Sequence, residues 1–338
     1  MLKTALQKVI DGQDLTLTES QNVVEAVMGG EAEEVQVAAL LTALASKGET
    51  EDEIAGAASA MRAAALAFPA QPQALDIVGT GGDHSNSFNI SSTAGLVIAS
   101  LGYDVIKHGN RAASSKSGAA DVLEALGFPI NQSVAASQAM LANHHFAFLF
   151  AQKYHPAMKY VGPVRKELGV RTIFNLLGPL ANPAMPGQMV LGVYSADLLE
   201  PMAQVLHQLG VQSANIIYGT DGLDEASISA PTKVVQLRGD QIQFLTIEPE
   251  DFGLTRATKE EIVGGTAEEN AAITRAVLAG QAGPHRDIVV LNAALGLNAL
   301  DNKISLAEGV ELAQSALDSG KAAQLLDDLL AAGQEVGQ

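Results

Sequence analysis

The most informative stretch of the sequence is Leu75-Asp76-Ile77-Val78-Gly79-Thr80-Gly81-Gly82-Asp83. Its apolar first half predicts a buried β-strand, and the three glycines that follow let the backbone approach a ligand closely. The Ala- and Leu-rich run from Ser92 to Leu101 predicts a helix soon afterwards. A strand, a glycine loop and a helix in this order gather backbone N–H groups around one point, which is typical of a phosphate site.

Two common nucleotide sites do not fit this loop. A Walker loop needs Lys followed by Ser or Thr after its last glycine, whereas Asp83-His84 follows Gly82. A dinucleotide site needs an acidic residue at the end of the next strand, whereas the next predicted strand ends in Lys107-His108. The remaining interpretation is a site for a phosphorylated sugar.

Beyond this stretch, short apolar runs alternate with helical runs, which favours an α/β domain with a mostly parallel central sheet. The predicted strands are Leu75–Val78, Asp104–Lys107, Phe146–Phe150, Met189–Val193, Asn215–Tyr218 and Ile288–Asn292. The predicted helices are Ala119–Leu126, Ser133–Asn143, Leu198–Leu209, Ala267–Ala279, Ser305–Asp318 and Lys321–Ala332. Val234–Leu237 and Ile242–Ile247 flank a turn and predict a β-hairpin.

Residues 1–68 predict a small all-helical domain. Thr18 and Gln21 form a capping box before a helix over Asn22–Met28, and Thr50 and Glu53 cap an Ala-rich helix that runs through Ala67. Between them, Val35, Val37–Leu41 and Leu44 supply the apolar stripe of another helix. Two prolines after Phe68 mark a linker, and residues 74–338 form the α/β domain. We expect a segment within residues 155–187, which is rich in proline, to complete the helical domain.

The composition limits the partners. The 338 residues carry a net charge of −18, which repels nucleic acid and anionic membranes. The chain has no uncharged apolar run long enough for a transmembrane helix, and its first residues lack a long apolar segment and a cleavage site, so we do not expect export. The absence of cysteine excludes disulfides and thiolate chemistry and fits a cytoplasmic protein.

Two further polar clusters follow the glycine loop. Ser87 and Asn89-Ile90-Ser91-Ser92 supply more hydroxyl and amide groups than the N-cap of a helix needs, so a phosphate or hydrated metal is expected to use the excess. The second cluster is Lys107-His108-Gly109-Asn110-Arg111 with Ser114-Ser115-Lys116-Ser117-Gly118. Positive charge gathered here in an acidic chain predicts an oxyanion cradle rather than a solvated loop.

Asp221-Gly222-Leu223-Asp224-Glu225 follow the predicted strand Asn215–Tyr218. Alone they indicate a polar turn, but neighbouring carboxylates beside a pyrophosphate site suit Mg²⁺, which shares its ligands with phosphates. In the proline-rich connection, Arg165 offers the planar fork that recognises a carboxylate, and Tyr154-His155-Pro156 precedes it.

Taken together, these motifs resemble the anthranilate phosphoribosyltransferase family. In chain order they are Gly79–Asp83, Asn89–Ser92, Lys107–Arg111 with Ser114–Gly118, Ala120–Gly127, Tyr154–Met158, Arg171–Pro183 and Asp221–Glu225. The resemblance implies transfer of the phosphoribosyl group of 5-phosphoribosyl 1-pyrophosphate (PRPP) to the amine of anthranilate, a step of tryptophan biosynthesis. It also implies a homodimer formed through the helical domain, with the substrates meeting between the two domains.

The resemblance also implies binding roles for individual residues. For PRPP it implies Gly79, Gly82, Asp83, Ser87, Asn89, Ile90, Ser91, Ser92, Lys107, His108, Gly109, Asn110, Arg111, Ala112, Ala113, Ser114 and Ser115. For anthranilate it implies Gly79, Asn110 and Arg165, with His155 nearby, and for Mg²⁺ it implies Ser91, Asp224 and Glu225. No residue is assigned a proton transfer; Lys107 and Mg²⁺ are expected to stabilise the leaving pyrophosphate.

Two positions depart from the family's pattern, and two rival functions stay open. Ser92 stands where threonine is common, and Ala119 stands where a serine often touches the phosphoribosyl group. A pyrimidine nucleoside phosphorylase resembles this family in fold but uses free phosphate and no metal. A nucleic-acid-binding relative should be basic, which the charge of −18 argues against.

Overall fold

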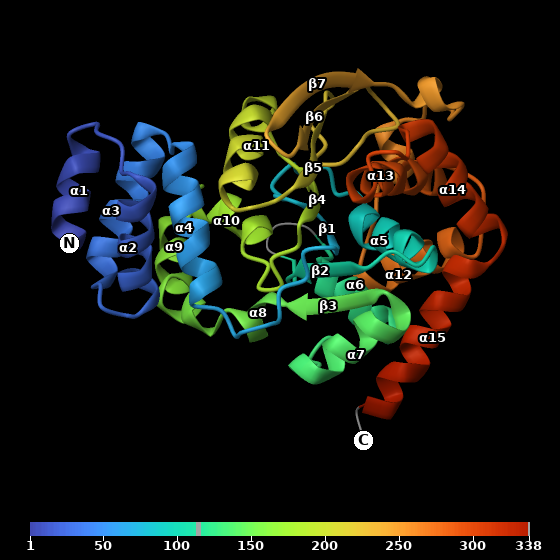
Figure 1. Ribbon diagram of the computed structural model, residues 1–338, viewed down its shortest axis with the longest axis horizontal. Coiled ribbons are helices and arrows are strands. Elements are labelled where there is room, and N and C mark those ends of the chain that lie inside the picture. The colour runs from blue at the N-terminus through green and yellow to red at the C-terminus, as the bar shows by residue number, and fades with distance from the viewer. Residues whose placement is uncertain (113–115, 337–338) are drawn as a thin grey trace.

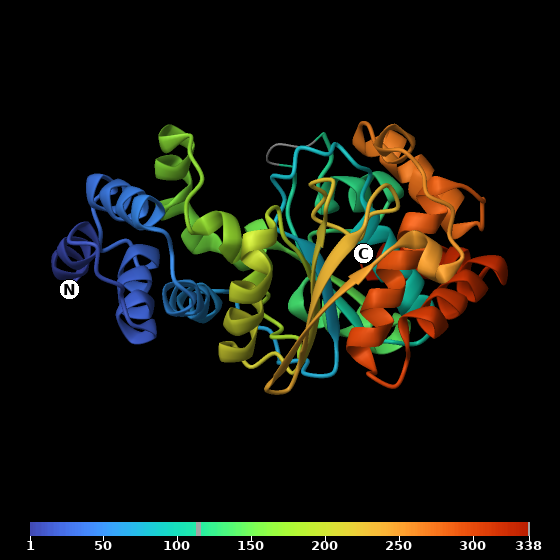
Figure 2. The same cartoon turned by 90° about the horizontal axis from the view of Figure 1, so that it is seen from above.

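The structure is a computed structural model that describes residues 1–112 and 116–336 (Figure 1). The predicted site residues Ala113, Ser114 and Ser115 therefore lie outside the described residues. Helices of the N-terminal part stand at one end of the long axis, and a sheet covered by helices on both faces forms the rest (Figures 1 and 2). The predicted fold class, a small helical domain with a larger α/β domain, is confirmed.

The central sheet has seven strands in the order β3-β2-β1-β4-β5-β6-β7. Strands β1 to β5 run parallel, and β6 and β7 form the predicted antiparallel hairpin at one edge. The strands are β1 (Leu75–Gly79), β2 (Val105–Gly109), β3 (Phe146–Phe150), β4 (Gln188–Gly192), β5 (Ser213–Gly219), β6 (Thr232–Arg238) and β7 (Gln241–Ile247). The chain adds β2 and β3 on one side of β1 and then β4 on the other, and open α/β sheets bind ligands at the carboxyl ends beside such a reversal.

Alternating strand residues pack against helices on opposite faces of the sheet. Val190 of β4 enters the core under α5 (Ile90–Ser100) and α13 (Pro284–Leu300), whereas Met189 and Leu191 enter the core shared with α10 (Phe174–Leu180) and α11 (Leu199–Gln208). The other elements of this domain are α6 (Ala119–Leu126), α7 (Val134–His144), η2 (Ala196–Leu198), η3 (Pro249–Phe252), η4 (Lys259–Ile262), α12 (Ala267–Leu278), α14 (Leu306–Asp318) and α15 (Lys321–Val336). None of the described helices is long and apolar enough to cross a membrane.

The N-terminal part contains α1 (Leu2–Ile10), α2 (Leu17–Met28), α3 (Glu34–Lys47) and α4 (Glu51–Ala63). Gly56 lets α4 approach α2 closely, because a Cβ at this position would overlap the carbonyl oxygen of Leu17. The connection after β3 forms α8 (Ala151–Tyr154), η1 (Pro156–Tyr160) and α9 (Gly162–Leu168) before α10. It returns to the bundle, where α9 packs on α3 and α10 packs on α4. The exact domain boundaries stay a prediction.

Several predicted elements are wrong. Ile288–Asn292 is not a strand but part of α13, where all five side chains are buried. A helix buried on every side shows no amphipathic period, so its apolar run cannot be told from a buried strand. Helix α2 is capped by Thr16 and Glu19 rather than by Thr18 and Gln21. In addition, α4 ends at Ala63 instead of Ala67, and Val35 is 75% exposed instead of belonging to an apolar stripe.

Candidate active site

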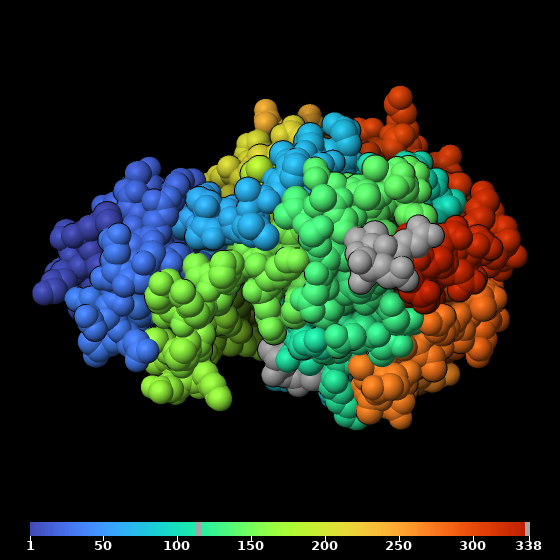
Figure 3. All heavy atoms as spheres, turned by 90° about the horizontal axis from the view of Figure 1, so that it is seen from below, coloured from blue at the N-terminus to red at the C-terminus, as the bar shows by residue number. Residues whose placement is uncertain are grey.

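A cavity of about 400 Å³ lies at the carboxyl ends of β1, β2 and β4. It is lined by the glycine loop, the start of α5, the loop after β2, the turn after β5 and the connection between α9 and α10. Viewed from below, the molecule is hollowed between the yellow-green segment that includes α9 and the green-to-teal part of the α/β domain (Figure 3). The cavity thus lies where the sheet topology predicts a ligand site.

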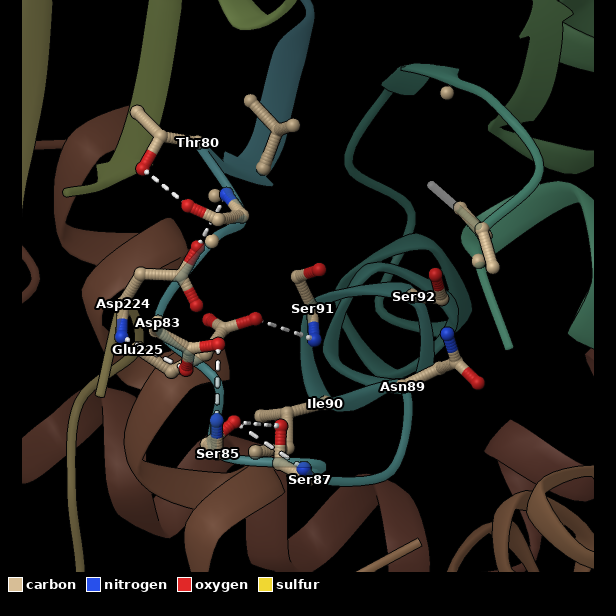
Figure 4. A pocket seen from close by; sticks show the side chains of 18 of the residues that line it. Thr80, Asp83, Ser85, Ser87, Asn89, Ile90, Ser91, Ser92, Asp224 and Glu225 are labelled. Atoms are coloured by element: carbon tan, nitrogen blue, oxygen red, sulfur yellow. Dashed lines mark hydrogen bonds between the residues drawn. The ribbon is translucent and has the colours of Figure 1, made fainter. Parts of the chain in front are cut away.

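Paired glycines on β1 and β4 make room for one carboxylate. Gly79 and Gly192 face each other in the register of the two strands. A Cβ on Gly79 would overlap the carboxylate of Asp224, and a Cβ on Gly192 would overlap its backbone carbonyl oxygen. Asp224 can therefore sit over the ends of these strands, where its Oδ2 accepts a hydrogen bond of 2.7 Å from the N–H of Gly81 (Figure 4).

The glycine loop lines the cavity and contains two backbone donors without a protein acceptor in the described chain. Gly81 and Gly82 have φ values of +69° and +77°, which glycine adopts without strain. Within the described residues, the N–H groups of Gly82 and Asp83 donate to no protein acceptor. Successive N–H groups in such a turn form a concave site that suits an anion.

The start of α5 adds two hydroxyl groups. Ser92 is buried, and its Oγ has no hydrogen-bond partner in the described part of the chain. The Ser91 hydroxyl accepts a 3.2 Å hydrogen bond from Lys107 Nζ, and its backbone N–H donates to Glu225 Oε1 at 3.2 Å. By contrast, the Asn89 side chain is already bonded to Ser117 and Asn270, so it holds the loop in place.

Three carboxylates crowd one wall of the cavity (Figure 4). Burial, then the charges of Asp83 and Glu225, raises the pKa of Asp224 well above its usual range. Burial also raises the pKa of Glu225 to about 7, although Lys107 and Ser91 oppose the shift. Such crowding of negative charge fits a site for a divalent cation.

The donor set fits Mg²⁺ rather than a metal held by protein alone. No group of three carboxylate or imidazole residues in the described chain converges closely enough to hold a metal by itself. Mg²⁺ usually takes one or two carboxylates and completes its shell with water and substrate phosphates. Asp224 and Glu225, together with the hydroxyl of Ser91, supply such an incomplete set.

Lys107 brings a buried positive charge to the same wall. Its ammonium donates to the carbonyl oxygen of Ile77 as well as to Ser91. Burial lowers the pKa of Lys107, whereas the charges of Asp76, Glu225 and Asp224 act against this shift. Behind it, Asn182 Nδ2 donates to both Asp76 Oδ2 and the carbonyl of Ile106, each at 2.9 Å.

The sequence and the fold match known proteins. Residues 71–323 match the a/b domain of a glycosyl transferase family, and residues 3–65 match its helical bundle domain. Anthranilate phosphoribosyltransferase of Lacticaseibacillus casei is 56% identical, covering 98% of this chain and 97% of the relative. The chain belongs to the anthranilate phosphoribosyltransferase family.

Solved members of this family have the same fold. The crystal structure of anthranilate phosphoribosyltransferase from Thermus thermophilus matches with a TM-score of 0.93 and 44% identity, covering 98% of this chain and 99% of that one. The enzyme from Saccharomyces cerevisiae, in complex with PRPP and Mg, matches with a TM-score of 0.89 and 28% identity, covering 99% and 98%. These matches do not favour the rival functions, phosphorylase and nucleic-acid binder.

Most residues that the family resemblance assigned to PRPP line the cavity in this family member. Those in the described chain are Gly79, Gly82, Asp83, Ser87, Asn89, Ile90, Ser91, Ser92, Lys107, His108, Gly109, Asn110, Arg111 and Ala112. Arg111, however, is paired with Asp121 at 2.9 Å and Glu124 at 2.7 Å, so its charge is already matched. Ala119, which departs from the family's pattern, also lines the cavity. Their roles toward a ligand stay predictions.

The residues expected to bind anthranilate are less well gathered. Gly79 and Asn110 line the cavity, but His155 and Arg165 do not. His155 packs behind the wall, with its ring centroid 5.0 Å from that of His108. Burial lowers the pKa of His108 to about 3 and that of His155 to about 4, so both rings are neutral at neutral pH. The Arg165 guanidinium lies over the Phe174 ring, 5.5 Å from its centroid.

Some cavity residues have no predicted role from the sequence, among them Arg171, Asn175 and Tyr194. Arg171 comes from the connection between α9 and α10, Asn175 lies in the first turn of α10, and Tyr194 follows β4. Arg171 and Asn175 fall within a motif that carried the family resemblance, which is the signal that could have marked them. Their arrival at the cavity depends on how the connection folds back over the bundle, and local sequence does not show this.

Proposed function

We propose that this chain catalyses phosphoribosyl transfer from PRPP to anthranilate, which yields N-(5-phosphoribosyl)anthranilate and pyrophosphate. The observation that carries the proposal is the cavity wall on which open N–H groups of Gly82 and Asp83 lie beside the carboxylates of Asp224 and Glu225. A pyrophosphate needs both features, because donors bind its oxygens and a divalent cation offsets its charge. The yeast relative solved with PRPP and Mg supports this interpretation.

In the proposed reaction, the anthranilate nitrogen forms a bond to C1 of the ribose while the bond from C1 to the pyrophosphate oxygen breaks. The pyrophosphate leaves with the bonding electron pair, and the nitrogen then releases a proton to solvent. The amine is aromatic and unprotonated at neutral pH, so no strong base is required. The residues orient the two substrates and stabilise the charge on the leaving group.

Each wall of the cavity has a proposed part in this reaction. The phosphates are held by the N–H groups of the glycine loop, by the Lys107 ammonium and by the Ser92 hydroxyl, which has no partner among the described residues. Ser91, Asp224 and Glu225 hold Mg²⁺, which supplies positive charge to the departing pyrophosphate when bound. Asn110 and Arg165 take the anthranilate carboxylate, and Arg165 must leave the Phe174 ring to reach it.

We also propose that two chains associate through the helical domain. Ile10 of α1 and Val35 of α3 are 60% and 75% exposed, which leaves apolar surface on this bundle. Light scattering during gel filtration tests this: twice the chain mass supports a homodimer, and the single mass excludes it. A cytoplasmic location stays a prediction from the sequence.

Loss of anthranilate fluorescence tests the proposed activity. The protein is mixed with anthranilate and PRPP, with Mg²⁺ or with excess chelator. Signal loss that requires both PRPP and Mg²⁺ supports the transferase. Phosphorolysis of a pyrimidine nucleoside with free phosphate, unaffected by chelator, would instead support the phosphorylase.

A further inference from the structure

We propose that Arg171 is a positioning residue, which orients the peptide between Gly82 and Asp83 for the pyrophosphate of PRPP. The inference rests on the proposed transferase activity and adds a residue to it. Arg171 lies neither in the glycine loop nor in the loop after β2; it comes from the connection between α9 and α10.

Two contacts hold the Arg171 side chain at the glycine loop. Its Nη2 donates a 2.6 Å hydrogen bond to the carbonyl oxygen of Gly82. Its guanidinium carbon lies over the ring of Tyr194, 4.1 Å from the ring centroid. A planar guanidinium can stack on a ring and donate at its edge at the same time, whereas an ammonium cannot. Tyr194 therefore fixes the plane in which Arg171 donates.

The hydrogen bond from Arg171 sets the direction of a neighbouring donor. The C=O and N–H groups of a planar trans peptide point in opposite directions. Because Arg171 holds the carbonyl of Gly82, the N–H of Asp83 points away from Arg171. That N–H has no acceptor within residues 1–112 and 116–336, so it is free for a ligand.

Arg171 also joins the loop to the helical side of the molecule. Other hydrogen bonds of residues 80–88 go to the α/β domain, for example from Thr80 N–H to Gly192, from Gly81 N–H to Asp224 and from Phe88 N–H to Ile262. The bond from Arg171 comes from a segment flanked by α9, which packs on α3, and α10, which packs on α4. The loop is thus held from both sides of the cavity.

Direct contact between Arg171 and the pyrophosphate is the competing explanation. A direct ion pair depends on charge, so Arg171→Lys would keep most of it. Positioning depends on the planar fork and on the stack with Tyr194, so Arg171→Lys would lose nearly as much as Arg171→Ala. The two variants therefore separate the explanations.

The test measures the KM for each substrate, kcat and the melting temperature for wild type, Arg171→Ala, Arg171→Lys and the control Arg256→Ala. Arg256 is a surface arginine paired with Glu248 and Glu250, and its replacement should leave both KM values unchanged. We expect both Arg171 variants to raise the KM for PRPP about tenfold or more, as for a lost hydrogen bond to a charged donor. The KM for anthranilate and the melting temperature should change little.

A double-mutant cycle with Tyr194→Ala tests the stacking contact. If Tyr194 acts through Arg171, the double variant should raise the KM for PRPP no more than the larger single effect. The proposal is overturned by additive effects, by an Arg171→Lys variant close to wild type, by a rise confined to the KM for anthranilate, or by no change in KM. A wild-type protein that consumes no anthranilate would instead refute the proposed function itself.

Discussion

The two loops that line the cavity, the glycine loop and the loop after β2, carry similar polar residues, but their described residues differ in how many groups are already bonded. In the glycine loop, the N–H groups of Gly82 and Asp83 are open, and the adjacent carboxylates crowd one another. In the loop after β2, Asp121 Oδ2 accepts from the N–H groups of Ala112 at 2.8 Å and Gly118 at 2.9 Å. Asp121 and Glu124 also bond Arg111.

We infer from this difference that the glycine loop binds the ligand, whereas the loop after β2 shapes the cavity. Open donors near a cation site bind an anion without first breaking a protein hydrogen bond. Bonded donors contribute shape, because the bonds from Ala112 and Gly118 to Asp121 hold the described residues of the loop after β2 against the cavity. Four predictions test the contrast, from the largest expected effect to the smallest.

Removing the crowded carboxylates should have the largest effect. The double variant Asp224→Ala with Glu225→Ala should lower kcat/KM by about 10²–10³-fold or more, because the charge of the leaving pyrophosphate loses its cation. Activity is measured across a Mg²⁺ titration. Asp240→Ala, at a 94% exposed position in the hairpin turn, is the control and should behave as wild type. An unaltered Mg²⁺ dependence in the double variant would refute the metal assignment.

The paired glycines should separate function from folding. A Cβ at Gly79 overlaps the Asp224 side chain and approaches the backbone oxygen of Asp224 only to 3.2 Å. Gly79→Ala should therefore lower kcat/KM about tenfold or more while the melting temperature stays nearly unchanged. Gly192→Ala overlaps the Asp224 backbone and should lower the melting temperature by several degrees. Thermal unfolding and kinetics on both variants check this. A large loss of stability in Gly79→Ala would mean that Gly79 serves the fold instead.

A substitution that disturbs the loop after β2 should have a weaker effect on activity. Asp121→Asn leaves one acceptor oxygen where a carboxylate served two backbone N–H groups and Arg111. We expect the KM for PRPP to rise about three- to tenfold with unchanged kcat, because the wall loosens without losing a ligand. Glu124→Gln, which disturbs only the exposed contact to Arg111, is the matched control. A larger effect than that of Gly79→Ala would reverse the contrast between the loops.

The smallest expected effect is on stability and concerns His155, which packs against His108 of β2. The pKa of His155 is about 4 in the folded chain and about 6.5 when unfolded, so its neutral form adds stability above pH 6.5 that is lost as pH falls toward 4. His155→Phe cannot titrate, so its unfolding free energy should fall less between pH 7 and pH 5, by up to about 1.4 kcal/mol per pH unit. Denaturant unfolding of both proteins checks this, and parallel pH profiles would contradict it.

The sequence predicted those features that depend on local pattern. The apolar run before Gly79 and the run Phe146–Phe150 predicted strands correctly because glycine or a change of period ends each one. Asp224 and Glu225 line the cavity, as expected from the acidic motif after Asn215–Tyr218 and from the family resemblance, and their role toward a metal stays a prediction.

The rest depends on tertiary contacts. Arg111 and Arg171 look alike as cations in a polar stretch, yet one is matched by two carboxylates and the other donates to the glycine loop. Ile288–Asn292 predicted a strand because burial on all sides removes the helical period. Whether a donor is open or bonded is a property of the packed structure, and no sequence pattern encodes it.

A crystal structure with PRPP and Mg²⁺ bound tests the central claim most directly. We predict that pyrophosphate oxygens lie within hydrogen-bond distance of the N–H groups of Gly82 and Asp83, with the metal between them and Asp224 or Glu225. If the pyrophosphate instead lies against the loop after β2 while the glycine-loop N–H groups face only water, the claim is contradicted.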